Sequence, residues 1–244
     1  MQPRNATRHE PPARLSEDFD LSDLRLAASN PSPIAFSDAV NRVAGNLVGH
    51  VNLNVGSGRN FEPGFLQLDR VQHPGVDVVY DLEHAASGRP LPFGDDTVDF
   101  ILCSHVLEHV RGLVDAMREF HRVLKPGGHL LVIAPYASSD DAWEDPTHVR
   151  AFTEKSFMYF DERLYATDGH AGSYPSEVDY IFEPVRLQCV PHPEYADLAR
   201  QAAFDPAARA ELETKKRFLR NVIQEVHAVL KAVKPEAADA EEAA

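Results

Sequence analysis

The fold of this chain is decided by the stretch Leu53-Asn54-Val55-Gly56-Ser57-Gly58 and by Leu66-Gln67-Leu68-Asp69 shortly after it. In each stretch a short apolar run ends in residues suited to ligand binding. Gly56 and Gly58 permit a positive φ and let a ligand approach the backbone closely. The carboxylate of Asp69 can accept hydrogen bonds from both hydroxyls of a ribose. This arrangement predicts a nucleoside-binding edge on a parallel sheet.

Strands and crossovers alternate around this stretch. One helix is predicted over residues 113–124, and Lys125-Pro126-Gly127-Gly128 is a strong signal for its end. The repetition of strand, crossover and strand favours an α/β fold with a parallel sheet. Residues 56–64 are too few to hold a crossover helix between the first two strands. The predicted strands cover residues 51–55, 65–68, 76–80, 97–103 and 129–134.

Outside this region the signals are weaker. Apolar spacing predicts a helix after Pro33, through Leu47, and a short helix over residues 154–160. Residues 178–182 and 186–190 are expected to pair as late strands around Pro184. The chain is then expected to be helical over 206–234. There an apolar stripe packs against its own domain or forms a dimer seam. The stripe consists of Leu212, Leu219, Val222, Val226, Val229 and Val233.

The formal net charge of −14 over 244 residues argues against a nucleic-acid partner, because phosphate binding relies on clustered Lys and Arg. Cys103 and Cys189 are too few to form a disulfide framework, which indicates a reducing, cytoplasmic compartment. The polar residues 1–14 contain no apolar core of a signal peptide, and no apolar stretch approaches the roughly 20 residues of a membrane span. We therefore expect a cytoplasmic protein with a small-molecule partner.

Five further motifs follow the first stretch in order: Asp81-Leu82, Leu91-Pro92-Phe93, Asp99-Phe100-Ile101-Leu102, His105-Val106-Leu107-Glu108-His109 and Arg122-Val123-Leu124-Lys125-Pro126-Gly127-Gly128. With this ordered set, residues 51–135 resemble the class I S-adenosylmethionine-dependent methyltransferases. The resemblance is to the type 11-like proteins, in a bacterial subgroup with a short first loop. It implies an α/β, Rossmann-like, mostly parallel sheet with flanking helices, late antiparallel strands and a C-terminal helical extension. It also implies S-adenosylmethionine as the cofactor.

The resemblance assigns cofactor-binding roles to four residues of the first motifs. Gly56 and Gly58 would hold the methionine part of the cofactor against the backbone, and Asp69 would bind the ribose hydroxyls. Asn54 stands where the family usually has an acid. Its amide oxygen would still accept from the ammonium group, with less charge attraction.

Four residues after the third and fourth strands complete the implied cofactor site. Asp81 would accept a hydrogen bond from the adenine amino group, and Leu82 would pack on the ring. Ser104 and His105, just past the fourth strand, would line the sulfonium.

The candidates for catalysis and metal binding are histidines and one carboxylate. His105 and His148 are the predicted catalytic residues, since the segment that holds His148 would cover the acceptor pocket. Glu108 and His109 lie three and four residues after His105, so all three share one face of a helix and can bind a divalent metal, with His148 or Asp145 completing the shell. Alternatively, Glu108 and His109 cap and pack the helix start.

The expected organisation has four parts. Residues 1–30 form a flexible segment, 31–192 the methyltransferase domain with an acceptor-side lid at about 136–176, 193–234 C-terminal helices, and 235–244 a disordered acidic tail. A homodimer through the C-terminal helix is one interpretation of the late stripe. The expected function is methyl transfer from S-adenosylmethionine to a small-molecule acceptor such as a sugar or metabolite hydroxyl. The alternative is a catalytically inactive nucleoside-binding partner protein with the same fold.

Overall fold

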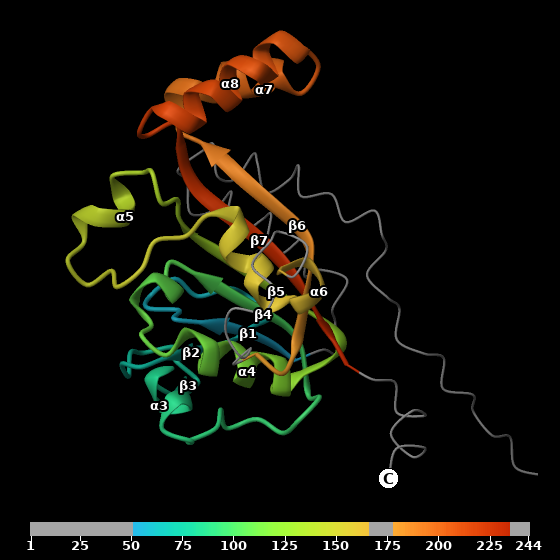
Figure 1. The fold of residues 1–244 in the computed structure, drawn as a ribbon. Coiled ribbons are helices and arrows are strands. Elements are labelled where there is room, and N and C mark those ends of the chain that lie inside the picture. The colour runs from blue at the N-terminus through green and yellow to red at the C-terminus, as the bar shows by residue number, and fades with distance from the viewer. Residues whose placement is uncertain (1–50, 166–177, 235–244) are drawn as a thin grey trace, which may run out of the picture.

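The computed structural model of the chain describes residues 51–165 and 178–234, in which a seven-stranded sheet has the order β3-β2-β1-β4-β5-β7-β6 (Figure 1). Strands β1 to β5 run parallel, and β7 is antiparallel to both β5 and β6. This confirms the α/β, Rossmann-like sheet with late antiparallel strands. The strands are β1 (Asn52–Val55), β2 (Leu66–Asp69), β3 (Val78–Val79), β4 (Val98–Ser104), β5 (Leu124–Pro135), β6 (Ile181–Pro191) and β7 (Ile223–Val233).

Strand β1 lies between β2 and β4, so the chain leaves it toward one side of the sheet and returns on the other. In open α/β sheets, ligands bind at such a switch point, outside the carboxyl ends of the strands. The connection from β1 to β2 contains no helix, as predicted. The short connection keeps the loop 56–65 close to the ends of β1 and β2.

Helix α4 (Leu113–Val123) shows how the sequence builds the core beside this edge. Its buried side chains recur every three or four residues, which turns one apolar face toward the sheet. The helix ends at Val123, where Leu124 is extended and starts β5 directly. The residues predicted to end the helix, Lys125 to Gly128, have no pairing partner in β4. Leu124 pairs with Val98 and His129 with Phe100, so the four residues between them bulge out of β5.

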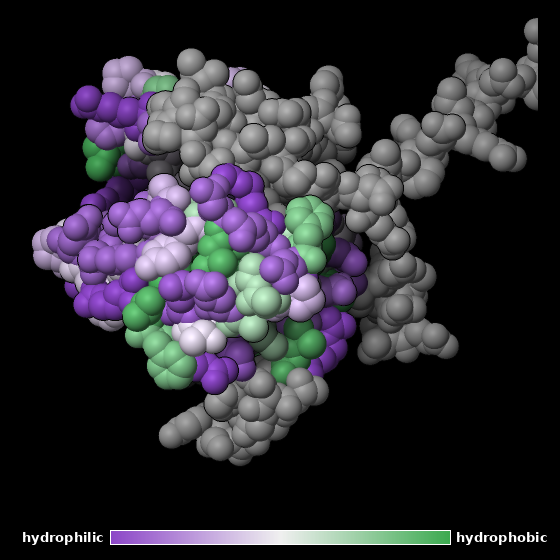
Figure 2. Space-filling model, turned by 90° about the horizontal axis from the view of Figure 1, so that it is seen from above, coloured by the Kyte–Doolittle hydropathy of each residue, from purple (hydrophilic) through white to green (hydrophobic). Residues whose placement is uncertain are grey.

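The other helices are short, apart from α7 and α8, which form a hairpin beyond the end of the sheet between β6 and β7 (Figure 1). Seen from above, the described surface is mostly hydrophilic, with separate hydrophobic patches (Figure 2). The predicted short helix is present as the 3-10 helix η2 (Glu154–Phe160). The remaining helices are α3 (Glu83–Ala86), η1 (Leu107–His109), α5 (Asp141–Glu144), α6 (Glu162–Tyr165), η4 (Pro193–Tyr195), α7 (Ala196–Ala202) and α8 (Pro206–Phe218).

The predicted pair of late strands around Pro184 is wrong. Residues 181–191 form the single strand β6, which pairs along its length with β7. The register shifts between Pro184 and Arg186, so a bulge accommodates the proline. A proline is tolerated at a sheet edge or at a bulge, and β6 has both properties.

The predicted helix over 206–234 is right only as far as Phe218. Residues 223–233 form β7, which lies between β5 and β6. Val226 and Val229 are buried in this strand, so they cannot form the proposed helical dimer seam. A strand buried on both faces is a nearly continuous apolar run, and its valines matched a helical spacing by chance.

Several predictions fall on residues outside the described ranges. These are the helix after Pro33, the N-terminal segment 1–30, the tail 235–244, and the part of the lid after residue 165. Within the described ranges, no helix combines the length and the apolar character that crossing a membrane requires.

His129 in β5 gives the fold a predicted sensitivity to acid. Burial, aided by the charge of Lys231, lowers the pKa of His129 to about 4. An unfolded histidine has a pKa of about 6.5. Between pH 6.5 and pH 4, His129 is mostly protonated in the unfolded chain but not in the folded one. Stability is therefore lost as the pH falls from about 6.5 to about 4, by about 3 kcal/mol in total.

We expect His129→Leu to reduce this loss, measured as the free energy of unfolding in urea at several pH values. His73→Leu, in the loop after β2, is the matched control and should keep the wild-type slope. Equal slopes in wild type and His129→Leu would contradict the assignment.

Candidate active site at the switch point

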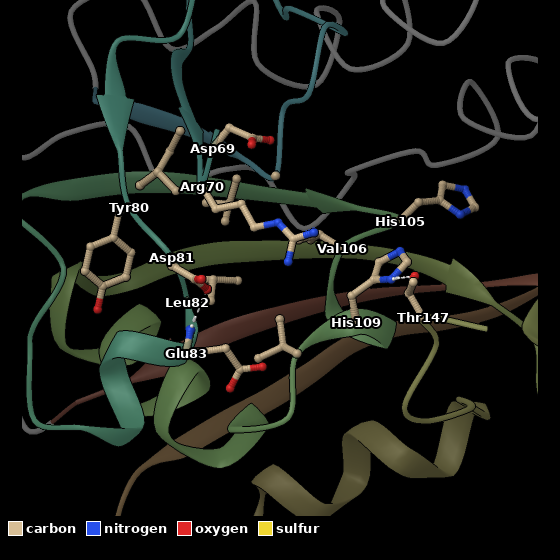
Figure 3. Close-up of a pocket in the computed structure, with 14 residues that line it drawn as sticks. Asp69, Arg70, Tyr80, Asp81, Leu82, Glu83, His105, Val106, His109 and Thr147 are labelled. Carbon is tan, nitrogen blue, oxygen red and sulfur yellow. Dashed lines mark hydrogen bonds between the residues drawn. The ribbon is translucent and has the colours of Figure 1, made fainter. Parts of the chain in front are cut away.

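A cavity of about 210 Å³ opens at the carboxyl ends of β1 to β4 (Figure 3). Strand ends and the residues just after them supply most of its wall. The predicted residues Gly56, Asp69, Asp81, Leu82, His105 and His109 line it. The other lining residues are Val55, Leu68, Arg70, Tyr80, Glu83, Val106, Val110 and Thr147.

The backbone of Gly56 lies so close to the side chain of Val106 that it leaves no room for a Cβ atom. Its φ is +69°, and a Cβ atom there would lie 2.4 Å from Cγ2 and 2.6 Å from Cβ of Val106. Only glycine fits without displacing a neighbour. The amide of Gly56 donates to the carbonyl of Leu68 (2.8 Å), which ties the end of β1 to the end of β2.

Asp69 is held by the loop around it. Its Oδ2 accepts from the backbone N–H of Gly58 (2.8 Å) and its Oδ1 from that of Val71 (2.8 Å). Each carboxylate oxygen has two lone pairs, so each keeps one for another donor. Asp69 can therefore accept from two neighbouring hydroxyls while it holds the loop.

Asp81 and Glu83 stand where β3 meets α3. Oδ1 of Asp81 accepts from the backbone N–H of Glu83 (3.1 Å), as Figure 3 shows. The carboxylate of Glu83 accepts from the backbone N–H groups of Arg111 (2.6 Å) and Gly112 (3.1 Å). Glu83 thus fixes the start of α4 against this wall, and Asp81 keeps Oδ2 for a ligand.

Three predicted cofactor residues, Asn54, Gly58 and Ser104, are not among the described residues that line the cavity. The side-chain amide of Asn54 is buried and donates to the carbonyl of Asn60 (2.9 Å) and to Oε1 of Gln67 (2.7 Å). Gly58 acts through its bond to Asp69. Ser104 ends β4 and pairs with Ile133 in the sheet. Their direct contact with a cofactor stays a prediction.

His105 follows β4 in the left-handed region, with φ +52°. Its Nε2 lies 3.1 Å from Oε1 of Glu225, and Oε2 of Glu225 lies 2.8 Å from Nε2 of the buried His227. Burial lowers the pKa of His105, but the two neighbouring carboxylates, Glu108 and Glu225, outweigh burial and raise it to about 10. Near neutral pH, His105 is therefore a charged hydrogen-bond donor rather than a proton acceptor.

The segment after β5 reaches the cavity through Thr147. Its Oγ1 lies 2.9 Å from Nδ1 of His109 (Figure 3). The backbone N–H of Val149 donates to the carbonyl of Glu108 (2.9 Å), and Arg150 donates to the carbonyl of Arg111 (2.7 Å). These contacts fasten residues 147–150 to residues 108–111, and a lid over the site stays a prediction.

The candidate metal ligands Glu108 and His109 do lie together, and His148 joins them. The prediction that His105 shares a helical face with them is wrong, since His105 precedes η1 with a left-handed φ and is not in the group. The rings of His109 and His148 pack edge to face with centroids 4.7 Å apart. Asp145 lies outside this group of ligand atoms and instead accepts from the hydroxyl of Thr147 (2.7 Å). The catalytic role of His148 is not tested by this geometry and stays a prediction.

A second hollow of about 580 Å³ adjoins the first and shares Arg70, Glu83, His109 and Thr147 with it. Arg111, Pro146 and Val149 complete its wall. In the view of Figure 3, the guanidinium of Arg70 extends over the middle of the first cavity. The two hollows therefore share part of one wall, beside the segment that holds residues 146–149.

Sequence reasoning missed Arg70, Thr147 and Glu225. Arg70 directly follows the predicted acid Asp69, and this adjacency was the available signal. Thr147 lies within the Asp145–Arg150 stretch, where only His148 and Asp145 were singled out. Glu225 lay in a segment predicted to be helical, so its position opposite His105 could not be anticipated.

Comparison with known proteins shows which family model the chain matches. Residues 54–132 match the family model described as a methyltransferase domain. An uncharacterized methyltransferase of Bacillus subtilis, YcgJ, is 31% identical over 120 residues, which cover 44% of this chain and 47% of that protein. A demethylmenaquinone methyltransferase of Chlorobaculum parvum is 24% identical over 152 residues, covering 62% of this chain and 56% of that protein. The chain thus matches about half the length of these curated relatives.

Among solved structures, a SAM-dependent methyltransferase from Archaeoglobus fulgidus superposes with a TM-score of 0.50 at 16% sequence identity. The match covers 87% of this chain and 100% of that one. At this identity, the likeness supports the fold alone.

Proposed function

We propose, from the premise that the chain belongs to the class I S-adenosylmethionine-dependent methyltransferases, that it transfers a methyl group from S-adenosylmethionine to a small-molecule acceptor. The methyl donor would lie in the cavity at the ends of β1 to β4. The acceptor would lie beside it, under residues 145–150.

One observation carries this proposal. Gly56 has no room for a side chain, and Asp69 and Asp81, with acceptor oxygens to spare, line the same cavity. A nucleoside offers the matching donors, which are two ribose hydroxyls and one adenine amino group. Gly56 would admit the methionine part of the donor against the backbone, and Leu82 gives the adenine ring an apolar surface.

S-adenosylmethionine supplies a methyl group that its sulfonium has already activated. A bond forms between the acceptor atom and the methyl carbon while the sulfur–carbon bond breaks, which leaves S-adenosylhomocysteine. A hydroxyl acceptor also loses its proton to water. The protein has to hold the acceptor in line with the methyl group, and orientation of this kind supplies a large part of such rate enhancements.

Two observations, the lining of the second hollow and the name of a relative, each suggest one class of methyl acceptor. A sugar or metabolite hydroxyl fits the polar wall that Arg70, His109 and Thr147 give to the second hollow. A ring carbon of a quinone precursor is the second candidate, because relatives include a demethylmenaquinone methyltransferase. An inactive nucleoside-binding protein would bind the donor and methylate neither class.

Titration calorimetry of the full chain tests the proposal. We expect S-adenosylmethionine and S-adenosylhomocysteine to bind at one site per chain, and NAD to show no binding under the same conditions. No binding of either sulfur nucleoside up to millimolar concentration, or preferential binding of NAD, would overturn the proposal.

A further inference from the structure

Among the described residues, Glu108 in η1 is a buried carboxylate whose side chain has no hydrogen-bond partner. Its relative exposure is 1%, and neither oxygen accepts a hydrogen bond from the part of the chain that the structure describes. Nδ1 of His105 lies 3.5 Å from Oε1, which is longer than a normal hydrogen bond. Burying an ionised carboxylate is costly unless a cation or a set of donors compensates for the lost water. His105 is the nearest basic side chain, but among the described residues neither oxygen of Glu108 has a hydrogen-bond donor, so both keep their lone pairs for a ligand.

Two imidazoles face this carboxylate from different segments. His109 follows it in η1, and His148 comes from the segment after β5. One nitrogen of each ring and one oxygen of Glu108 all lie within 4.8 Å of one another. The bond from the N–H of Val149 to the carbonyl of Glu108 (2.9 Å) holds the two segments together at this point. The three donor groups are thus brought together by tertiary structure and not only by their spacing in the sequence.

The hydrogen bonds around the rings fix which nitrogen carries a lone pair. The hydroxyl of Thr147 donates to the carboxylate of Asp145 (2.7 Å), so its oxygen accepts from Nδ1–H of His109 (2.9 Å). Nδ1–H of His148 donates to the carbonyl of Ala142 (3.1 Å). In the neutral form of each ring, the lone pair then lies on Nε2. Metal-binding histidines characteristically donate their other nitrogen to a carbonyl or a carboxylate in this way.

We propose that Glu108, His109 and His148 bind a divalent transition-metal ion of the zinc type beside the methyl-donor cavity. Two imidazole nitrogens and one carboxylate oxygen suit such an ion and leave coordination positions open, whereas magnesium prefers an all-oxygen shell. Metal–ligand bonds of about 2.0–2.2 Å place two donors on one ion at most about 4.4 Å apart, so a small rotation of the side chains closes the site.

The position of the site suggests its use. His109 lines both hollows, so an ion bound there would face the space proposed for the acceptor. A divalent ion lowers the pKa of a hydroxyl that it binds. This use of the ion rests on the proposed function, but binding of the ion does not.

The test is a titration of the full chain with Co²⁺ after a chelator has removed adventitious metal, followed by visible absorption, with Zn²⁺ as the competitor. We expect one ion per chain. Glu108→Gln and His148→Asn should each lower the affinity at least ~100-fold, because one of three protein ligands is lost. Thr147→Val keeps all three ligands but removes the hydroxyl that links His109 to Asp145, and it should lower the affinity by about 10–100-fold. His73→Asn, a histidine of the surface loop after β2, should bind as the wild type does.

Absence of a stoichiometric ion, or wild-type affinity in Glu108→Gln and His148→Asn, would overturn the site. If circular dichroism shows that either variant does not fold, the Co²⁺ affinity of Thr147→Val becomes the test. An unchanged Co²⁺ affinity in Thr147→Val would then contradict the proposed site. Calorimetry with S-adenosylhomocysteine on the metal-free protein separates the two proposals. Nucleoside binding without metal binding overturns only the metal site, and metal binding without nucleoside binding overturns only the methyltransferase proposal.

Discussion

Asp69→Ala is expected to weaken binding of S-adenosylmethionine at least ~100-fold. Two hydrogen bonds from ribose hydroxyls to a charged acceptor are lost, each worth ~1.5–3 kcal/mol. The variant also releases the N–H groups of Gly58 and Val71, which Asp69 holds at 2.8 Å each. Both effects act in the same direction. Calorimetry with S-adenosylhomocysteine measures the change directly.

Two further variants separate these effects. Asp69→Asn keeps one acceptor oxygen and should lose less affinity than Asp69→Ala. Asp197→Ala removes a carboxylate whose side chain is 80% exposed on α7, and it should bind the ligand as the wild type does. If Asp69→Ala binds S-adenosylhomocysteine as tightly as Asp197→Ala does, Asp69 does not contact the ribose.

Gly56→Ala is expected to lower the free energy of unfolding by about 2–5 kcal/mol and to abolish measurable donor binding. A left-handed φ costs an alanine ~1–2 kcal/mol, and overpacking adds ~1–3 kcal/mol. The overlap is with Cβ of Val106 at 2.6 Å, so a rotation of the valine side chain cannot relieve it. Urea denaturation gives the stability, and calorimetry gives the binding.

Gly58→Ala is the matched control for this prediction. Its φ of +54° is similar, but a Cβ atom there would meet none of the described residues within 4 Å. It should lose only the ~1–2 kcal/mol of the backbone term. The double variant Gly56→Ala/Val106→Ala should regain part of the stability lost in Gly56→Ala. Equal losses in Gly56→Ala and Gly58→Ala would contradict the steric explanation.

The parallel half of the sheet was predictable because its signals are local. Each of β1, β2 and β4 is a short apolar run that ends in a turn or a polar residue, and the amphipathic pattern of α4 ends at a proline and two glycines. The antiparallel half was not predictable in the same way. The identity of β7 depends on burial between β5 and β6, which the spacing of its valines does not encode.

The residues of the candidate site also differ in whether a local sequence signal marks them. Gly56, Asp69 and Asp81 were found because each directly follows a predicted strand. Glu225 and Thr147 reach the site from segments 120 and 38 residues away from the side chains that they contact. Such contacts exist only in the folded chain. A pattern within one sequence therefore finds the wall proposed to bind the nucleoside and misses Glu225 and Thr147, which approach it from distant segments.

The place of β7 in the sheet has a consequence for biosynthesis. Its two neighbours, β5 and β6, both precede it in the chain, and neither pairs with the other. Until residues 223–233 have been synthesised, β5 has one unpaired edge and β6 lacks the strand with which it pairs in the described sheet. Unpaired strands are the kind of surface through which nascent chains aggregate. A chain that stops before residue 223 would also leave His105 without Glu225. Synthesis of residues 223–233 therefore completes both the sheet and the group of charged side chains around His105.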